Sequence, residues 1–218
     1  MHSDRIFNIN LNSITRRLDP NPYQPKRLEA IKAIKESPNN FEELLHKVEF
    51  KKRIVKSFEE ELPYLGLQNI ESNTGKYINK DDIKVSFSSA FKFKKGEILF
   101  PKLRPYLNKI HLCEFDGYCS TEFHVLKAQD VNNVYLSAFL RSSIVVSQTS
   151  CLMTGNTLPR LQTKDVTELI IPLPDMDVQK EIADKVIDNF KQSNALKVEA
   201  ETEFQKAKQQ VEQIILGK

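Results

Sequence analysis

Only six glycines occur in the 218 residues, and they do not form the glycine-rich turn between a strand and a helix that holds a phosphate or a dinucleotide. Cysteine is also scarce. Cys113, Cys119 and Cys151 show no C-x-x-C spacing, and the four histidines are scattered along the chain. We interpret the cysteines as buried free thiols, not as metal ligands or disulfides. The sequence therefore predicts no cofactor and no metal site.

Long apolar runs are absent as well. No segment approaches the roughly 18 consecutive apolar residues of a membrane-spanning helix. Residues 1–12 have neither the basic start nor the apolar centre of a signal peptide. These two absences predict a cytoplasmic protein without a membrane partner.

Two short motifs come close to catalytic patterns. Residues 19–23 (Asp-Pro-Asn-Pro-Tyr) are similar to the loop with which amino-methyltransferases hold their target amine, but adjacent prolines are missing. Residues 175–180 are similar to a nuclease metal motif, but two residues separate Asp177 from Lys180. We interpret Asp175 and Asp177 as helix-capping residues. Because no nucleophile can be tied to a base by spacing, we predict a binding protein without catalytic residues.

The clearest positive pattern lies at the end of the chain. Apolar or small residues recur there in steps of three and four without a proline or glycine, which predicts one helix over residues 177–216. Asp177 is placed to cap its start and Gly217 to end it. A helix of that length is roughly 58 Å long and must project from a domain of the remaining residues.

A projecting amphipathic helix buries its apolar stripe against another helix, and no other segment of this sequence has a comparable length. We therefore predict a coiled coil with another polypeptide. Its seam comprises Ile182, Val186, Phe190, Leu196, Ala200, Phe204, Ala207, Val211 and Ile214.

Short apolar runs separated by polar turns occupy most of the remaining sequence. They predict strands over residues 7–12, 64–67, 77–78, 83–87, 98–100, 107–113, 123–126 and 169–174, and helices over 28–34, 41–48 and 134–141. The predicted fold class is α/β (mixed α+β). It comprises a globular domain over residues 1–176 with a mixed β-sheet and an N-terminal strand-helix segment over 1–48, followed by the long C-terminal coiled-coil helix over 177–218.

Charge is unevenly distributed. The net charge is only +3, but residues 51–110 contain thirteen Lys and Arg against seven acidic residues. A locally basic domain suits a polyanion, because phosphate neutralisation releases counterions. The alternative is a solvated basic face without a partner.

Several stretches, in order from about residue 40 to the C-terminus, resemble one family. They are residues 96–100 (Gly-Glu-Ile-Leu-Phe) with 104–109, 119–123 (Cys-Ser-Thr-Glu-Phe), 154–156 with 159–161, and 171–174 followed by 179–182. Together they resemble the target-recognition domain and conserved helix of specificity subunits from type I restriction-modification enzymes. A full specificity subunit carries two recognition domains and two long helices. This sequence, with one of each, resembles a half-subunit.

The resemblance implies a non-catalytic subunit that reads double-stranded DNA and holds methyltransferase (modification) subunits, and through them restriction subunits, on a bipartite site. Each recognition domain would read one half-site through the major groove, and an antiparallel helix pair would set the gap between halves. We predict a homodimer through the C-terminal helix. Pairing with a different half-subunit is the alternative.

Candidate DNA contacts are basic and amide residues in predicted turns and in the basic region. They are Lys51, Lys52, Arg53, Lys92, Lys94, Lys95, Arg104, Asn108, Lys109, Asn156 and Arg160. Arg104 and Arg160 could contact phosphate or brace their loops, and we interpret Glu122 as a structural hydrogen-bond acceptor. Two rival functions remain: a coiled-coil protein-interaction module, and a recognition fragment of a bifunctional restriction/methyltransferase enzyme.

Overall fold

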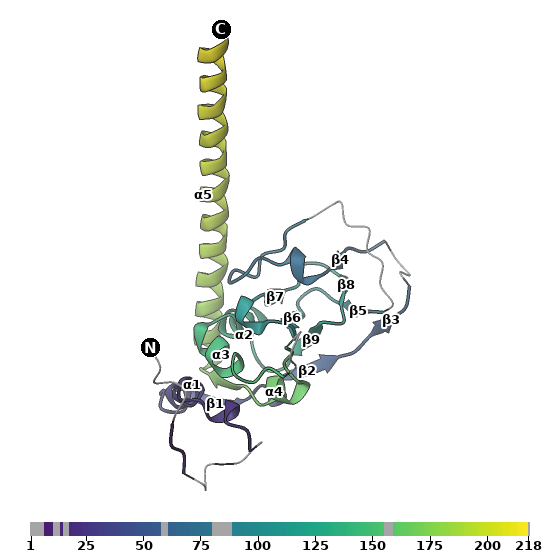
Figure 1. Ribbon diagram of the computed structural model, residues 1–218, viewed down its shortest axis with the longest axis vertical. Coiled ribbons are helices and arrows are strands. Elements are labelled where there is room, and N and C mark those ends of the chain that lie inside the picture. The colour runs from purple at the N-terminus through teal and green to yellow at the C-terminus, as the bar shows by residue number, and fades with distance from the viewer. Residues whose placement is uncertain are drawn as a thin grey trace.

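The computed structural model describes residues 7–10, 14, 18–57, 61–79, 89–154 and 159–217. Within these residues one long helix projects from a mixed α+β domain (Figure 1). The predicted fold class is therefore confirmed. The predicted single mixed sheet is replaced by two four-stranded sheets and one two-stranded sheet.

The two four-stranded sheets differ in strand direction. The first is antiparallel, with the order β2 (Val48–Lys51), β9 (Phe123–Ala128), β6 (Ile98–Pro101) and β7 (His111–Leu112). The second has the order β3 (Ile54–Val55), β5 (Ala90–Phe93), β8 (Gly117–Ser120) and β4 (Tyr64–Leu65), and is mixed because β4 pairs with β8 in parallel.

The central strands of the first sheet are buried on both faces. In β6, Ile98 and Phe100 pack into one apolar cluster, whereas Leu99 packs into the other. Successive side chains of a strand point to opposite faces, so β6 separates the two clusters. One cluster lies between the first sheet and the helices, and the other lies between the two sheets. This explains why residues 98–100 read as a continuous apolar run.

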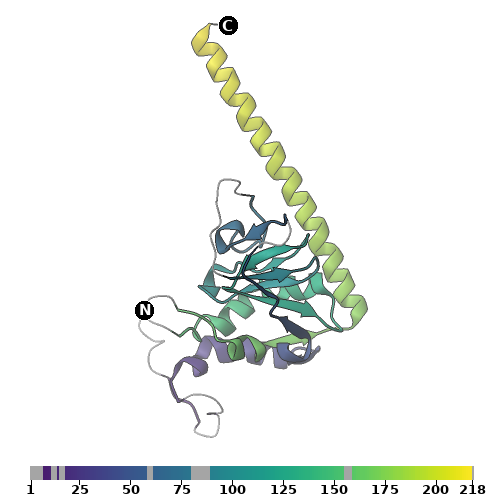
Figure 2. The same cartoon turned by 90° about the vertical axis from the view of Figure 1, so that its right-hand side faces the viewer.

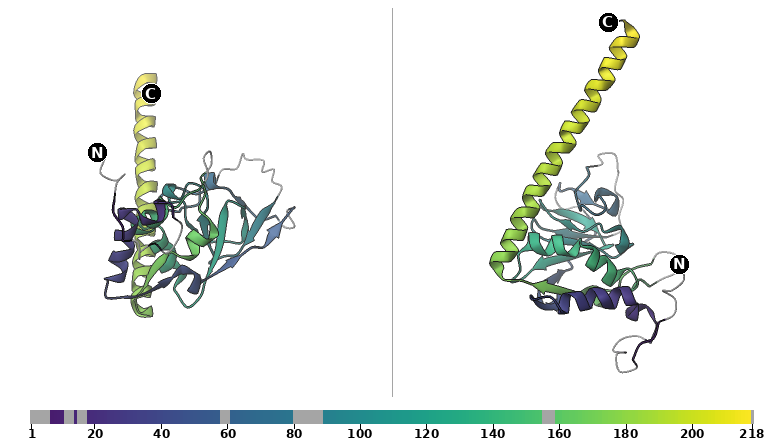
Figure 3. Two further views of the ribbon diagram at one scale, coloured as in Figure 1. Left: turned by 60° about the horizontal axis from the view of Figure 1, so that its bottom comes forward. Right: turned by 90° about the vertical axis from the view of Figure 1, so that its left-hand side faces the viewer.

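The helices and the two-stranded sheet cover one side of the first sheet (Figure 2). The α-helices are α1 (Pro25–Lys35), α2 (Asn133–Leu140), α3 (Ser143–Thr149) and α4 (Thr163–Thr167), and the 3-10 turns are η3 (Asn21–Tyr23), η4 (Leu44–His46), η5 (Leu67–Asn69) and η6 (Pro105–Leu107). Strands β1 (Asn40–Glu43) and β10 (Ile170–Leu173) pair antiparallel. Figure 3 shows α1 on the side of the domain at which the long helix begins.

Helix α5 (Met176–Leu216) comprises 41 residues without a break. The prediction that Asp177 caps the helix is wrong, because α5 begins at Met176 and Asp177 lies in its first turn. Asp175 occupies the N-cap position, but its side chain makes no capping hydrogen bond. Gly217 ends the helix in the left-handed conformation, with φ +64°. The predictions of a single long helix and of its glycine stop are confirmed.

Two predictions for the N-terminal segment are wrong where the structure describes it. Residues 7–10 form no regular strand, and 11–12 lie outside the described residues. Residues 41–48 are not an α-helix. They contain the last three residues of β1, the 3-10 turn η4 and the first residue of β2. Strand β1 exists because it pairs with β10, about 130 positions along the chain, where Asn40 lies opposite Leu173. Local periodicity does not report such a partner.

Predictions elsewhere had mixed outcomes. Helices α1 and α2, and strands β4, β6, β9 and β10, confirm the predicted elements at those positions. Of the predicted strand 77–78, only an isolated bridge between Ile70 and Tyr77 is present, and 107–113 is shortened to β7. The predicted strand 83–87 lies outside the described residues.

The three cysteines are free thiols, of which Cys113 and Cys119 are buried and Cys151 is partly exposed. Burial raises the pKa of the Cys113 and Cys119 thiols well above the ordinary value. Both therefore stay protonated and behave as small apolar side chains of the core.

Candidate nucleic-acid interface and helix seam

Two chain segments that pass between the four-stranded sheets bring four of the predicted basic residues together. Residues 51–53 lead from β2 in the first sheet to β3 in the second, and residues 94–97 lead from β5 back to β6. Because both segments cross between the same pair of sheets, Lys51, Lys94 and Lys95 line a common groove.

An ion pair ties the two crossing segments together. The guanidinium of Arg53 donates to both carboxylate oxygens of Glu97, at 2.9 Å from Nη1 and 2.7 Å from Nη2. The Glu97 side chain is buried and also accepts the backbone N–H of Lys94 at 2.8 Å. These bonds to Glu97 raise the pKa of Arg53. Arg53 was predicted as a DNA contact, and the structure gives it a bracing role in the floor of the groove.

The groove encloses about 660 Å³, and four lysines line it. Lys127 of β9 lies in it beside Lys51, Lys94 and Lys95. Lys51 also contacts Glu49, and this hydrogen bond lowers the pKa of Glu49. Sequence reasoning missed Lys127, because it is a single cation in a mainly apolar strand. Its signal is the period of two, which points Lys127 away from the face of Leu126.

A smaller hollow of about 180 Å³ adjoins the groove, and Lys51 lines both. Its other cations are Lys52 and Lys102, and its walls include Phe91 and His124. The ammonium of Lys102 donates to the carbonyl of Thr121 at 2.7 Å and lies 5.2 Å from the Phe91 ring centroid. Burial lowers the pKa of Lys102, and burial together with the charges of Lys102 and Lys52 lowers the pKa of His124 to about 3. His124 is therefore neutral at physiological pH.

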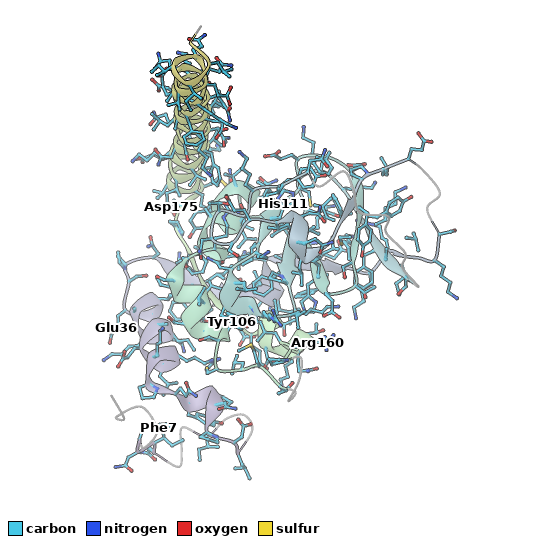
Figure 4. The ribbon with its side chains drawn as sticks, turned by 45° about the horizontal axis from the view of Figure 1, so that its top comes forward. Phe7, Glu36, Tyr106, His111, Arg160 and Asp175 are labelled. Carbon is cyan, nitrogen blue, oxygen red and sulfur yellow. The ribbon has the colours of Figure 1, made fainter. Side chains whose placement is uncertain are left out.

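Arg160 braces its loop. Its guanidinium donates to Glu122 from Nε at 2.9 Å and from Nη2 at 2.8 Å, and its backbone pairs with Thr154. These bonds lower the pKa of Glu122. Glu122 is thus a structural acceptor, in agreement with the prediction. Arg160 lies on the side of the domain away from α5 (Figure 4), and Asn156, between the two paired residues, lies outside the described residues.

The other candidate residues do not line the basic groove. Asn108 is buried, with a left-handed backbone (φ +52°), and donates to the carbonyl of Arg141 at 2.7 Å. Lys109 donates to the carbonyl of Leu67 at 2.8 Å. Arg104 is exposed in a left-handed conformation before η6. Lys92 follows Phe91 in β5, so it points away from the core between the sheets.

The predicted helix seam divides into two parts. In the proximal part of α5, residues 176–190, Ile182 packs on the core and Val186 and Phe190 line a cleft against the domain. In the distal part, residues 191–216, every side chain is exposed. Leu196, Phe204, Val211 and Ile214 are 64%, 65%, 55% and 79% exposed, and Ala200 and Ala207 lie on the same exposed part of the helix. Only the distal six of the nine seam residues are therefore free for a partner helix.

Gln179 fixes the start of α5 and was not predicted as a site residue. Its side-chain N–H donates to the carbonyl of Pro174 at 2.8 Å, and its side-chain oxygen accepts the backbone N–H of Asn132 at 2.9 Å. Asn132 also lines the basic groove. The groove therefore ends beside the attachment of the long helix.

Two further features bear on function. Among the described helices, none is both long enough and apolar enough to cross a membrane. In the same part of the chain, no group of three His, Cys, Asp or Glu side chains is arranged to hold a metal ion.

The sequence and the fold are similar to those of known proteins. The pattern of the family described as "Type I restriction modification DNA specificity domain" matches residues 43–203. The Type I restriction enzyme EcoDI specificity subunit of Escherichia coli is 29% identical over 125 residues, which are 56% of this chain and 28% of that protein.

Two solved structures share the fold. The HsdS subunit from Thermoanaerobacter tengcongensis matches with a TM-score of 0.56 and 23% identity, over 73% of this chain and 44% of that chain. A structure from work on complex assembly and conformational transition of the type I R-M system matches with a TM-score of 0.58 and 23% identity, over 75% of this chain and 46% of that one. The chain spans less than half the length of each of these relatives. Because the family pattern covers most of the chain, the protein belongs to the family of type I restriction-modification DNA specificity domains.

Proposed function

We propose that this chain is a non-catalytic DNA-recognition subunit that positions methyltransferase subunits, and through them restriction subunits, on a bipartite site. The observation that carries the proposal is the basic groove beside the attachment of a projecting helix. Lys51, Lys94, Lys95 and Lys127 line the groove, and the Arg53–Glu97 ion pair holds its two crossing segments in place. Lysines in such an arrangement suit the phosphates of a duplex and fix its register on the protein.

The partner of the distal part of α5 is, in this proposal, a second copy of the chain. Its exposed apolar residues recur with helical spacing, and a stripe of this kind is stable in water when it packs on another helix. An antiparallel pair would place one domain toward each end of a rod and relate the two by a two-fold axis. Two identical domains in opposed orientation would read an interrupted palindrome. A different half-subunit in place of the second copy would give two unrelated half-sites.

The DNA interface is tested by removing three groove cations. Lys94, Lys95 and Lys127 are changed together to Ala, and a control removes the same charge at Lys26, Lys32 and Lys35 of α1. The groove variant should bind specific and nonspecific duplexes more weakly, and its salt slope should fall by up to about 0.9 for each lost phosphate contact. The control should keep the parent slope. If both variants lost the same affinity, general charge and not the groove would account for binding.

Self-pairing is tested by changing Phe204 and Val211 together to Asp. Both side chains are exposed in the single chain, so the domain should keep its fold while light scattering changes from dimer to monomer. The monomer should bind one half-site and lose high-affinity binding to the full site. A parent protein that is monomeric at tens of micromolar would contradict self-pairing. Methyl transfer by the purified chain alone would instead favour the bifunctional-enzyme fragment, and DNA binding without sequence dependence would favour the interaction module.

A further inference from the structure

Helix α5 is attached to the domain at two places that are separated by a cleft. The first attachment is at its start, where Gln179 bonds to Pro174 and Asn132, and Ala183 is buried. The second begins about 22 Å along the helix from Gln179, where residues 194 and 197 meet the turn formed by residues 71–77. Two separated attachments define the direction of a rigid rod.

The cleft between the attachments encloses about 370 Å³. Val186, Ile187 and Phe190 line it from the helix, and Arg141 lines it from the domain. The guanidinium of Arg141 lies 5.7 Å from the Phe190 ring centroid. Between its two attachments the helix therefore meets the domain across a cleft, through the Arg141–Phe190 contact, and not through continuous close packing.

The 71–77 turn contacts the helix through polar side chains. The ammonium of Lys76 donates to the side-chain oxygen of Asn194 at 2.8 Å. The ammonium of Lys197 lies 3.7 Å from a carboxylate oxygen of Glu71. Hydrogen bonding to Thr74 and the nearby charge of Lys197 lower the pKa of Glu71, so this carboxylate is ionised at neutral pH.

The turn itself is held against the domain. The backbone N–H of Asn73 donates to the carbonyl of Asn108 at 3.0 Å, and the Nδ1 atom of His111 lies 2.8 Å from the carbonyl oxygen of Gly75. Gly75 has φ +69°, and a Cβ there would lie 2.0 Å from the carbonyl oxygen of Ile110. The turn is therefore packed too closely for any residue but glycine at position 75, and it can act as a rigid support.

We propose that the 71–77 turn fixes the tilt of α5 relative to the DNA-reading domain, and that Glu71 and Lys76 are positioning residues for the gap between half-sites. This inference rests on the proposed function as one reader of a bipartite site. It assigns a role in gap selection to two residues that lie outside the basic groove. Figure 4 shows His111, which supports this turn, on the side of the domain toward α5, whereas Arg160 lies away from it.

The geometry makes the tilt critical. From Ala183 to Leu216 the helix extends about 50 Å, so a tilt of about 5° moves its far end by roughly 4 Å. One base pair of B-DNA is about 3.4 Å long and turns the half-site by about 35°. A change of a few degrees at the attachment therefore shifts the far end sideways by about the rise of one base pair, which changes how the second reader is placed relative to the first.

The test removes the two contacts without altering the helix. Glu71→Gln and Lys76→Met are combined in one variant. The control combines Lys32→Met in α1 with Glu36→Gln at the C-cap of that helix, and so makes the same two side-chain changes at an exposed ion pair outside the 71–77 turn. The half-site is first obtained by selection from random duplexes with the parent protein. Binding is then measured on duplexes in which two half-sites are separated by gaps that differ by one base pair.

The variant should lose at least about fivefold of the preference for the best gap over its neighbours, while single half-site affinity stays within about twofold. The control should keep the parent preference. An unchanged gap preference in the variant would overturn the inference. Failure of the parent to bind any half-site would instead overturn the proposed function.

A second measurement follows the tilt directly. Spin labels at Lys164→Cys and Lys208→Cys, in a Cys151→Ser background and diluted with unlabelled protein, report the distance between the domain and the distal part of α5. The Glu71 and Lys76 variant should give a broader distance distribution than the parent. An identical distribution would contradict the supporting role of the turn, even if gap preference changed.

Discussion

The proximal and distal parts of α5 carry the same kind of apolar stripe in different surroundings. In the proximal part, Ile182 packs on the core and Ala183 is only 3% exposed, so the stripe belongs to the fold of the single chain. In the distal part, Leu196 and Phe204 are more than half exposed. One periodic pattern therefore packs on the domain in the proximal part and lies exposed in the distal part. The two parts should respond differently to the same substitution.

The largest difference between the two parts of α5 is expected when an alanine in each part is changed to aspartate. Ala183→Asp would bury a carboxylate between α5 and α2, and should lower the free energy of unfolding by about 3 kcal/mol or more. Its melting temperature should fall by roughly 6–12 °C for a chain of this size. Ala200→Asp lies on the exposed part and should leave the melting of the domain nearly unchanged while it weakens self-association. Calorimetry with light scattering would measure both, and equal melting temperatures for the two variants would contradict the division of the helix.

A proline in the distal part of α5 should weaken the helix without lowering the stability of the domain. Ala200→Pro removes a backbone hydrogen bond and should cost about 3 kcal/mol in helix stability. We expect this loss to appear in self-association and in the helical signal of circular dichroism, not in the unfolding of the sheets. Ala200→Ser is the mild control, since it keeps the backbone N–H. Cooperative loss of the whole fold by the proline variant would show that the distal part supports the domain.

Helix α5 was predictable from the sequence because its signal is local. Steps of three and four over forty residues, with Gly217 at the end, need no knowledge of any distant segment. Strand β1 was not predictable in this way. All four of its residues are exposed, so it lacks the alternation that indicates a half-buried strand, and its partner β10 is far along the chain.

The sequence predicted which kinds of residue form the candidate site, but not how they are arranged. The basic segments at residues 51–53 and 94–95 do meet in one groove. The sequence could not show that Arg53 is paired with an acidic side chain whereas Lys94 is not engaged in that pair, because the partner Glu97 lies 44 positions along the chain from Arg53. Asn108 looked like a polar turn residue. Its left-handed backbone instead turns the amide inward to Arg141. The pairing of strands that are distant in the sequence therefore decides which of the cations face outward.

Low pH should destabilise the domain more than the distal part of α5, because His124 is buried in the domain. Its pKa is lowered to about 3 by burial, so the folded state keeps it neutral whereas the unfolded state takes up a proton below about pH 6.5. The contribution of neutral His124 to the free energy of unfolding is thus fully present above pH 6.5, and it is lost as the pH falls toward 3. At pH 5 the loss should be about 2 kcal/mol from this group alone. His124→Gln should flatten the pH dependence of unfolding, and an unchanged pH dependence in this variant would contradict the role of His124.

The smallest effect is expected at the end of the distal part. Gly217 and Gly75 both have positive φ, at +64° and +69°, but a Cβ at Gly217 would have no neighbour within 4 Å, whereas one at Gly75 would meet the carbonyl of Ile110. Gly217→Ala should therefore cost only the left-handed backbone strain of about 1 kcal/mol, and only the last turn should fray. Gly75→Ala should cost considerably more, because the same strain is joined by a clash with backbone that has to move. Hydrogen exchange should show the Gly217 effect within the last turn of α5 and the Gly75 effect across the 71–77 turn and β7. Similar exchange profiles in the two variants would mean that the turn is not the rigid support that the tilt of α5 requires.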